Sequence, residues 1–193
     1  MSLPNKLTIL RIVLTFLIMG LLFVPGAPAK GLCLVLFLLA AATDWWDGYL
    51  ARRFNQITPL GILLDPIADK VLVIGILLAF VQLELIRAWM LLVVVIREFV
   101  ITGVRLYAVS RHLVIPATRE GKHKTVSQMV TILVILVLLL VREFLTGRAA
   151  ETFEAWMAPT ILACLWVMVV LTVISGASFF WRNRDLLIDA TTR

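Results

Sequence analysis

Long apolar runs separated by short polar segments are the most regular feature of the chain. Several of these runs are shorter than the roughly 20 residues that a helix needs to cross a lipid bilayer. They reach that length only when polar residues such as Asp44, Asp65 and Arg97 are counted as part of the helices. The apolar runs are Leu7–Val24, Gly31–Thr43, Val71–Gln82, Met90–Ile96, Val126–Val141 and Thr160–Phe180.

This pattern predicts six membrane-spanning helices in a single all-α domain that occupies residues 1–193. We expect Phe153, Trp156 and Met157 to lie on a separate short surface helix, because Pro159 suits the first position of a new helix. The expected spans cover residues 6–24, 31–53, 60–83, 88–110, 124–143 and 159–181.

The first apolar run has two interpretations. The basic residues Lys6 and Arg11 lie at the start of an apolar stretch, which is followed by the small residues Ala27–Ala29. Basic residues, an apolar stretch and then small residues are the typical order in a secretory signal peptide. The same residues also fit a first membrane helix. We interpret the run as the first helix of the bundle.

Composition favours a membrane protein over a soluble one. Hydrophobic residues make up 62% of the chain and charged residues 16%, with a mean hydropathy of +1.03. A soluble domain usually has about 25% charged residues. Cys33 and Cys164 lie in separate apolar runs without paired spacing, so both are expected to be free thiols. We therefore predict an integral membrane bundle of six transmembrane helices.

The basic residues predict how the bundle is oriented. Lys and Arg number 18 against 12 Asp and Glu, which gives a net charge of +6, and they gather on alternate connections. By the positive-inside rule the richer side is cytoplasmic, with both termini there. Basic loops beside a bilayer suit anionic lipid headgroups, so this charge does not indicate nucleic acid. The richer side holds Lys6, Arg52, Arg53, Arg111, Arg119, Lys122, Lys124, Arg182, Arg184 and Arg193, and the other side holds Lys30, Arg87, Arg142 and Arg148.

Four of the six aspartates of the chain lie close together in the sequence. Asp44 and Asp47 are three residues apart near the end of the second expected helix, and Asp65 and Asp69 are four apart near the start of the third. Both spacings place a pair of side chains on one face of a helix. Because the turn between the two helices is short, the helices should be antiparallel neighbours with these faces opposite each other.

Four carboxylates at one place cannot all be ionised without a compensating positive charge. Oxygen ligands favour hard cations such as Mg²⁺ or Mn²⁺. Two such ions about 3.5–4 Å apart can clamp the entering and leaving oxygens of a phosphoryl displacement. The stretch therefore predicts a site for two divalent cations that hold phosphate. A structural network of the carboxylates with Arg52, Arg53 and Lys70 is the alternative interpretation.

Small residues accompany the aspartates. Gly48 follows Asp47, Ala51 lies one turn further on, and Gly61 lies one turn before Asp65. A helix surface without bulky side chains lets a ligand approach the backbone. Close packing between membrane helices is the other use of such residues.

This stretch resembles the complete signature of the CDP-alcohol phosphatidyltransferase family. The resemblance implies a six-helix membrane fold, usually a homodimer, which transfers a phosphatidyl or similar group from a CDP-linked donor to an alcohol and releases CMP. Three other stretches, "NKLTILRIV", "IREFVITGVR" and "GKHKTVSQM", are similar to members that use glycerol 3-phosphate as the acceptor. The matching signature residues are Asp44, Asp47, Gly48, Ala51, Arg52, Gly61, Asp65 and Asp69.

The resemblance also implies roles for these residues. Asp44, Asp47 and Asp65 would bind two Mg²⁺ or Mn²⁺ ions, and Asp69 would be both a ligand and the general base. The active site would face the cytoplasm at the inner membrane, where the donor CDP-diacylglycerol lies in the bilayer. The residues implied in donor binding are Asn5, Thr8, Gly48, Ala51, Arg52 and Gly61.

Basic residues in and after the fourth expected helix predict a second site, for the phosphate of the acceptor. A guanidinium inside a membrane span, such as that of Arg97, needs an anionic partner. Glu98 should point away from Arg97, because side chains at i and i+1 do not face each other on a helix. Arg105 lies eight residues on, near the same face, and Lys122 and Lys124 lie on the expected cytoplasmic side. The resemblance assigns Arg97, Arg105, Lys122 and Lys124 to the phosphate of glycerol 3-phosphate.

Three other functions stay open. A sibling transferase could use inositol phosphate or another alcohol, because the signature recognises the donor and not the acceptor. A prenyltransferase also holds pyrophosphate with aspartate-rich motifs, although such enzymes resemble longer chains. A cation transporter could use the same carboxylates, but the outer halves of the helices expected at 31–53 and 60–83 carry no further polar residues for a path.

Overall fold

The computed structural model describes the backbone of residues 3–54, 59–110 and 119–184. Side chains are described for residues 8–43, 68, 70–109 and 121–184. Within these ranges the chain forms helices and no strands, as expected for an all-α protein. The helices are α1 (Leu3–Leu22), α2 (Ala27–Phe54), α3 (Pro59–Gln82), α4 (Ala88–Ser110), α5 (Arg119–Arg142) and α6 (Arg148–Arg182).

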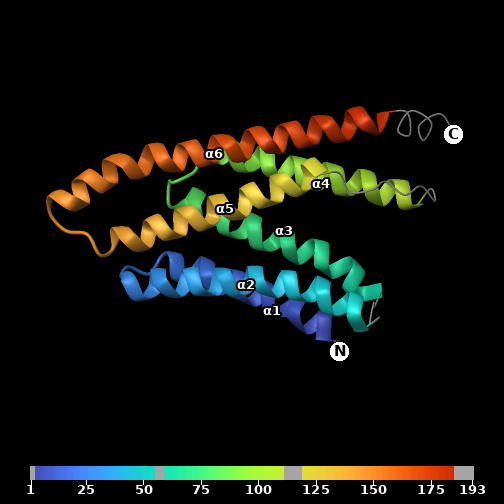
Figure 1. Ribbon diagram of the computed structural model, residues 1–193, viewed down its shortest axis with the longest axis horizontal. Coiled ribbons are helices and arrows are strands. Elements are labelled where there is room, and N and C mark those ends of the chain that lie inside the picture. Colours follow the sequence, from blue (N-terminus) through green and yellow to red (C-terminus); the bar gives the residue numbers. More distant parts are fainter. Residues whose placement is uncertain (1–2, 55–58, 111–118, 185–193) are drawn as a thin grey trace.

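Consecutive helices run antiparallel along the long axis of the molecule (Figure 1). The connections α1–α2, α3–α4 and α5–α6 lie at one end. The other end holds the starts of α1, α3 and α5 and the ends of α2, α4 and α6. The alternate connections predicted from the basic residues are therefore separated by the length of the bundle.

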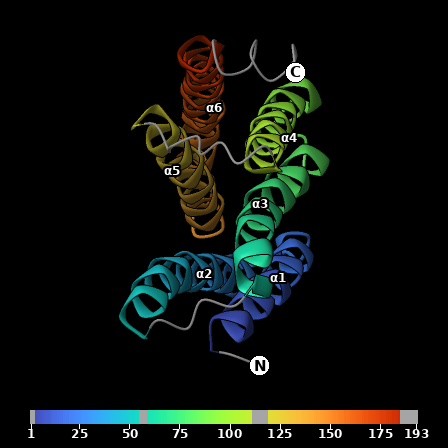
Figure 2. The same cartoon turned by 90° about the vertical axis from the view of Figure 1, so that its right-hand side faces the viewer.

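The helices pack in two groups of three (Figure 2). One group consists of α1 packed against α2 and α3, and the other consists of α6 packed against α4 and α5. Contacts of α5 with α2 and α3, and of α3 with α4, join the two groups. In the described part of the chain, α2 packs against α1 and α5, and α3 packs against α1, α4 and α5, without extensive contacts between α2 and α3. The apolar face of α1, with Leu14, Ile18 and Leu22 buried, supplies much of this shared packing.

A close approach of α3 to α1 depends on Gly75. A Cβ atom at Gly75 would lie 2.8 Å from Cγ2 of Thr15 and 3.1 Å from Sδ of Met19. Thr15 is held in place because its hydroxyl donates a hydrogen bond of 2.8 Å to the carbonyl oxygen of Arg11. Only a residue without a side chain fits between the two helices at this point.

The end of α1 is closed by a buried lysine from α2. Lys30 is 9% exposed, and its Nζ donates hydrogen bonds of 2.5 Å to the carbonyl oxygen of Leu22 and 3.1 Å to that of Val24. The last carbonyl groups of a helix have no partner within the helix, so a cation here satisfies them. This contact fixes the short connection between α1 and α2.

The outer faces of the helices expose many large apolar side chains, among them Phe16, Phe99 and Val167. Soluble monomers rarely expose contiguous apolar patches larger than a few hundred Å². Two stretches of the described residues, Gly121–Arg142 and Arg148–Arg182, are long and apolar enough to cross a membrane. The apolar parts described for α1, α2 and α3 are shorter.

The expected break before the last span is wrong. Helix α6 is continuous from Arg148 to Arg182 and includes Pro159. Phe153 packs against the core, and Met157 and Ile161 are buried, so one buried stripe with a spacing of four residues passes through the proline. Proline removes one backbone hydrogen bond from a helix. Burial of side chains on both sides of Pro159 keeps the helix continuous despite that loss.

Candidate functional site

The aspartate signature lies on two antiparallel helices at one end of the bundle. Asp44 and Asp47 are in the last turns of α2, and Asp65 and Asp69 are in the first turns of α3. Their side chains, and those of Asn5, Gly48, Ala51, Arg52 and Gly61, lie outside the described residues. The predicted convergence of the four carboxylates therefore stays a prediction.

The donor set itself fits a hard divalent cation. Helical backbone is continuous through each aspartate pair, so the spacings of three and four residues put both members of a pair on one face. Four carboxylates offer only oxygen ligands, which Mg²⁺ and Mn²⁺ prefer. Among the described side chains, no three His, Cys, Asp or Glu residues come together as an alternative metal site.

Helix α1 presents a buried polar stripe to its neighbours. Thr8, Arg11 and Thr15 are spaced by three and four residues, and they are 0%, 1% and 0% exposed. A polar stripe that is fully buried in a bundle is costly unless its groups are hydrogen-bonded or paired. Thr8, which was expected near the donor, is thus buried inside the bundle. The sequence analysis assigned no site role to Arg11, whose position on the same face was the available signal.

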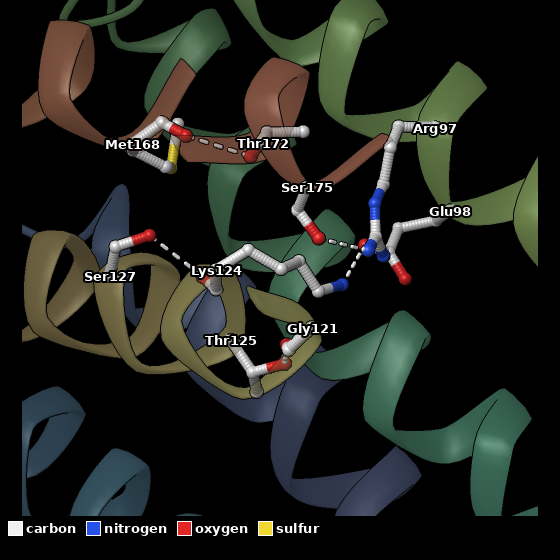
Figure 3. A network of polar contacts seen from close by, with 9 residues as sticks. All are labelled: Arg97, Glu98, Gly121, Lys124, Thr125, Ser127, Met168, Thr172 and Ser175. Atoms are coloured by element: carbon white, nitrogen blue, oxygen red, sulfur yellow. Dashed lines mark hydrogen bonds and ion pairs between the residues drawn. The ribbon is translucent and has the colours of Figure 1, made fainter. Parts of the chain in front are cut away.

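A cluster of ionic and polar side chains joins α4, α5 and α6 (Figure 3). Nη1 of Arg97 lies 3.2 Å from Oε1 of Glu98, and Nζ of Lys124 forms an ion pair with the same oxygen. Nη2 of Arg97 donates a hydrogen bond of 2.7 Å to the hydroxyl of Ser175 on α6. The four side chains Arg97, Glu98, Lys124 and Ser175 are called the basic cluster below.

The expectation that Arg97 and Glu98 point apart is wrong. Adjacent Cβ atoms on a helix do diverge, but both side chains are long enough for their ends to meet. Lys124 draws Glu98 toward α5, and Ser175 draws the guanidinium of Arg97 toward α6. Contacts with these two neighbouring helices decide where the ends of the side chains lie. Helical spacing alone could not have shown this.

Arg105 lies two turns further along α4 and also faces α6. Its guanidinium carbon is 5.6 Å from the centre of the Phe179 ring, a cation–π distance. Phe179 is one turn after Ser175, so both arginines contact the same face of α6. Nε of Arg97 and Nε of Arg105 are buried and have no hydrogen-bond partner within the described part of the protein.

The structure separates the two lysines that the sequence grouped together. Lys124 is 7% exposed and lies in the basic cluster, whereas Lys122 is exposed. Both belong to α5, which begins at Arg119 rather than near 124 as expected. Residues two apart on a helix lie on opposite sides, so Lys122 and Lys124 cannot share one face of α5.

Three polar residues of this region were not assigned from the sequence. Glu98 and Ser175 belong to the basic cluster, and Gln128 on α5 is 2% exposed, with no hydrogen-bond partner for its Nε2 among the described residues. A signal for Gln128 was present, because Lys124, Gln128 and Thr131 have helical spacing in an apolar stretch. Ser175 gave no such signal, since it is a single small polar residue in an apolar run.

This arrangement can bind an anion beside a bilayer. Arg97 and Lys124 carry positive charges that meet at the negative charge of Glu98, and Arg105 adds a third positive charge two turns further along α4. Guanidinium groups with unused N–H donors suit the oxygens of a phosphate group. A helical bundle with an apolar outer surface, an aspartate-rich helix pair and a partly buried group of cations indicates a membrane-associated protein that handles phosphate groups.

Comparison with known proteins identifies the class. The family model described as CDP-alcohol phosphatidyltransferase matches residues 1–181, and the chain belongs to this family. One relative is the CDP-diacylglycerol–glycerol-3-phosphate 3-phosphatidyltransferase of Bacillus subtilis (strain 168), 36% identical over 198 residues, which cover 96% of this chain and 97% of the relative.

Two further relatives carry the same name. That of Rickettsia typhi (strain ATCC VR-144 / Wilmington) is 32% identical over 179 residues, covering 93% of this chain and 95% of the relative. That of Pseudomonas fluorescens is 37% identical over 142 residues, covering 70% and 72%. The resemblance read from the aspartate signature is thus confirmed at the level of the family.

Proposed function

We propose that the protein transfers the phosphatidyl group of CDP-diacylglycerol to the sn-1 hydroxyl of glycerol 3-phosphate, giving phosphatidylglycerophosphate and CMP. Relatives with this activity in their names match nearly the whole chain, which supports the choice of both substrates. In the structure, the observation that carries the proposal is the group of cations formed by Arg97, Arg105 and Lys124. A neutral alcohol acceptor would not need such a group, whereas a phosphorylated one does.

The donor is proposed to lie at the aspartate-bearing ends of α2 and α3. Asp44, Asp47, Asp65 and Asp69 would hold two Mg²⁺ or Mn²⁺ ions, which supply positive charge against the donor's pyrophosphate when bound. The donor-binding residues that the family signature implies are Asn5, Thr8, Gly48, Ala51, Arg52 and Gly61. The small residues among them, Gly48, Ala51 and Gly61, would leave the helix backbone accessible to a nucleotide.

The acceptor is proposed to dock its phosphate on Arg97, Arg105 and Lys124. The buried Nε–H donors of the two arginines, which have no partner among the described residues, would be available to phosphate oxygens. Lys122, which is exposed at the same end of α5, would help to attract the anion from solution. Binding at this point would orient the acceptor's hydroxyl toward the ends of α2 and α3.

In the proposed reaction, Asp69 accepts the proton of the sn-1 hydroxyl as that oxygen attacks the β-phosphorus of the donor. A bond forms between this oxygen and phosphorus, and the bond from phosphorus to the CMP oxygen breaks. CMP leaves with the electron pair of that bond. Because the chain supplies no covalent intermediate in this scheme, positioning of the two substrates and stabilisation of charge provide most of the rate.

The arrangement in the membrane and the oligomeric state are also proposals. All six helices are 20–35 residues long, and about 20 residues suffice to cross a bilayer. We place both termini and the aspartates on the cytoplasmic side of the inner membrane, because the basic connections lie at that end of the bundle. The protein is proposed to be a homodimer, as the family resemblance implies.

The decisive experiment measures CMP release by the purified protein from CDP-diacylglycerol with a panel of acceptors. We expect release with glycerol 3-phosphate, loss of release on addition of EDTA, and recovery with Mg²⁺ or Mn²⁺. A preference for inositol phosphate would assign the protein to a sibling activity of the same family. No CMP release with any acceptor in the presence of both metals would refute the proposal.

A further inference from the structure

An acidic side chain lies at the centre of the proposed phosphate pocket. Glu98 is 12% exposed and its Oε1 contacts both Arg97 and Lys124. A carboxylate repels a phosphate, so its presence here weakens the attraction that the cations supply. Attraction of the acceptor's phosphate alone does not explain why the pocket contains it.

We infer that Glu98 is a positioning residue, which holds Lys124 of α5 against Arg97 of α4 before the acceptor arrives and limits the charge of the pocket. This inference deepens the proposed function and rests on it. Glu98 is not proposed to contact the reacting atoms. It acts through Arg97 and Lys124, whose charged ends it holds together.

The geometry supports the holding role. Lys124, Glu98 and Arg97 meet end to end, and Ser175 fixes the other side of the Arg97 guanidinium with a hydrogen bond of 2.7 Å. In Figure 3 the lysine stem crosses from α5 toward α4 and ends beside Glu98. Without the carboxylate, the ammonium and guanidinium groups would repel each other, and the flexible lysine would occupy other rotamers. A lysine that is already placed holds the bound acceptor in one orientation for the transfer step.

The charges support the limiting role. Arg97, Arg105 and Lys124 together with Glu98 leave a net charge of +2. A phosphate monoester carries about −1.5 to −2 at neutral pH. The pocket and its ligand therefore nearly neutralise each other. A pocket with an excess of positive charge would hold inorganic phosphate or other anions more tightly and would compete with the acceptor.

A purely structural role is the alternative. An ion pair between α4 and α5 could simply fasten the two helices together. Removing it would then lower stability and leave the affinity for anions unchanged. The two roles are distinguished by the affinity for inorganic phosphate and by the separate effects on kcat and KM.

The test compares Glu98→Gln, Glu98→Asp and Glu154→Gln with the wild-type protein. Gln keeps the size and an acceptor oxygen but removes the charge, whereas Asp keeps the charge and shortens the side chain. Glu154 is a matched control, because it pairs with Arg142 at 2.7 Å in an exposed ion pair. Arg142 is about 27 Å from Lys124 along α5, at about 1.5 Å per residue.

For Glu98→Gln we expect the inhibition constant of inorganic phosphate to fall about tenfold, since one nearby negative charge is removed. The kcat should fall about tenfold because Lys124 is no longer held, while KM for glycerol 3-phosphate should not rise. Glu98→Asp should keep the phosphate inhibition constant within about twofold and lose part of kcat, and Glu154→Gln should match the wild type. An unchanged or higher phosphate inhibition constant in Glu98→Gln would overturn the inference.

A second measurement separates this inference from the proposed function. The shift in melting temperature on adding inorganic phosphate needs no turnover. If the wild-type protein released no CMP with glycerol 3-phosphate, the proposed function would fall, and the phosphate shift would still decide the role of Glu98. A larger shift in Glu98→Gln than in the wild type supports the inference, and an equal or smaller shift overturns it.

Discussion

Replacement of Gly75 by alanine tests the packing that joins α1 to α3. The added Cβ would lie 2.8 Å from Cγ2 of Thr15, and carbon atoms prefer separations of at least about 3.5 Å. Thr15 cannot rotate away without breaking its hydrogen bond to the carbonyl oxygen of Arg11. Met19, at 3.1 Å, can move its sulfur more easily. One of the two helices must therefore shift.

The expected size of the effect follows from two opposing terms. Overpacking of a close contact destabilises a protein by about 1–3 kcal/mol. Alanine is a better helix former than glycine by about 0.8–1.0 kcal/mol. We expect Gly75→Ala to lose about 1–2 kcal/mol of unfolding free energy. Gly20→Ala and Gly103→Ala are matched controls, because a Cβ at either position meets no atom within 4 Å, and they should gain up to about 1 kcal/mol.

The assay is unfolding in mixed micelles by increasing SDS, followed by circular dichroism. The double variant Gly75→Ala/Thr15→Ser removes the clashing methyl group and keeps the hydroxyl that bonds to Arg11. It should recover about 1 kcal/mol relative to the sum of the single changes, a coupling in the range found for residues in contact. If Gly75→Ala were as stable as Gly20→Ala, or if the coupling were absent, the close approach of α1 and α3 would be refuted.

Three further predictions concern the proposed sites and the end of α1. Asp69→Asn should abolish CMP release with little change in donor binding measured by titration, and an equal loss of both would mean that Asp69 serves only the donor. Arg105→Ala should raise KM for glycerol 3-phosphate by about tenfold or more, as expected for a lost charge-assisted hydrogen bond, with a smaller rise for the exposed Lys122→Ala. Equal effects of the two would place the phosphate elsewhere. Lys30→Met leaves two carbonyl oxygens without their donor and should lower the unfolding free energy by about 1–3 kcal/mol, and unchanged stability would show that these carbonyls find other partners.

Much of the fold could be predicted because helices in a bilayer satisfy their own backbone hydrogen bonds. Apolar runs therefore correspond directly to helices, and α3 and α4 agree with the expected spans to within one residue. The errors occur where polar or helix-breaking residues adjoin a run. The start of α5 was placed too late because the basic residues before Lys124 were read as part of a loop. The break at Pro159 was expected from local preference, and long-range burial overrode it.

For the candidate site, too, local features could be predicted and long-range contacts could not. The aspartate signature is local in sequence, so its spacing on α2 and α3 and its family could be read without a structure. The basic cluster joins residues from α4, α5 and α6, which are up to 78 positions apart. Arg97, Arg105, Lys122 and Lys124 were predicted to form one site. The contacts of Arg97 with Ser175 and of both Arg97 and Lys124 with Glu98 were not predicted, since they depend on how three helices pack.

The sequence by itself determined the helical class, the family and the candidate residues of the site, because these depend on composition, periodicity and short spacings. Tertiary structure alone decided that Glu98 contacts Lys124, that Lys122 stays at the surface, and that α6 continues through its proline. Each of these depends on the ends of long side chains or on burial against a neighbouring helix. Such contacts are set by the relative positions of whole helices, which no short stretch of sequence specifies.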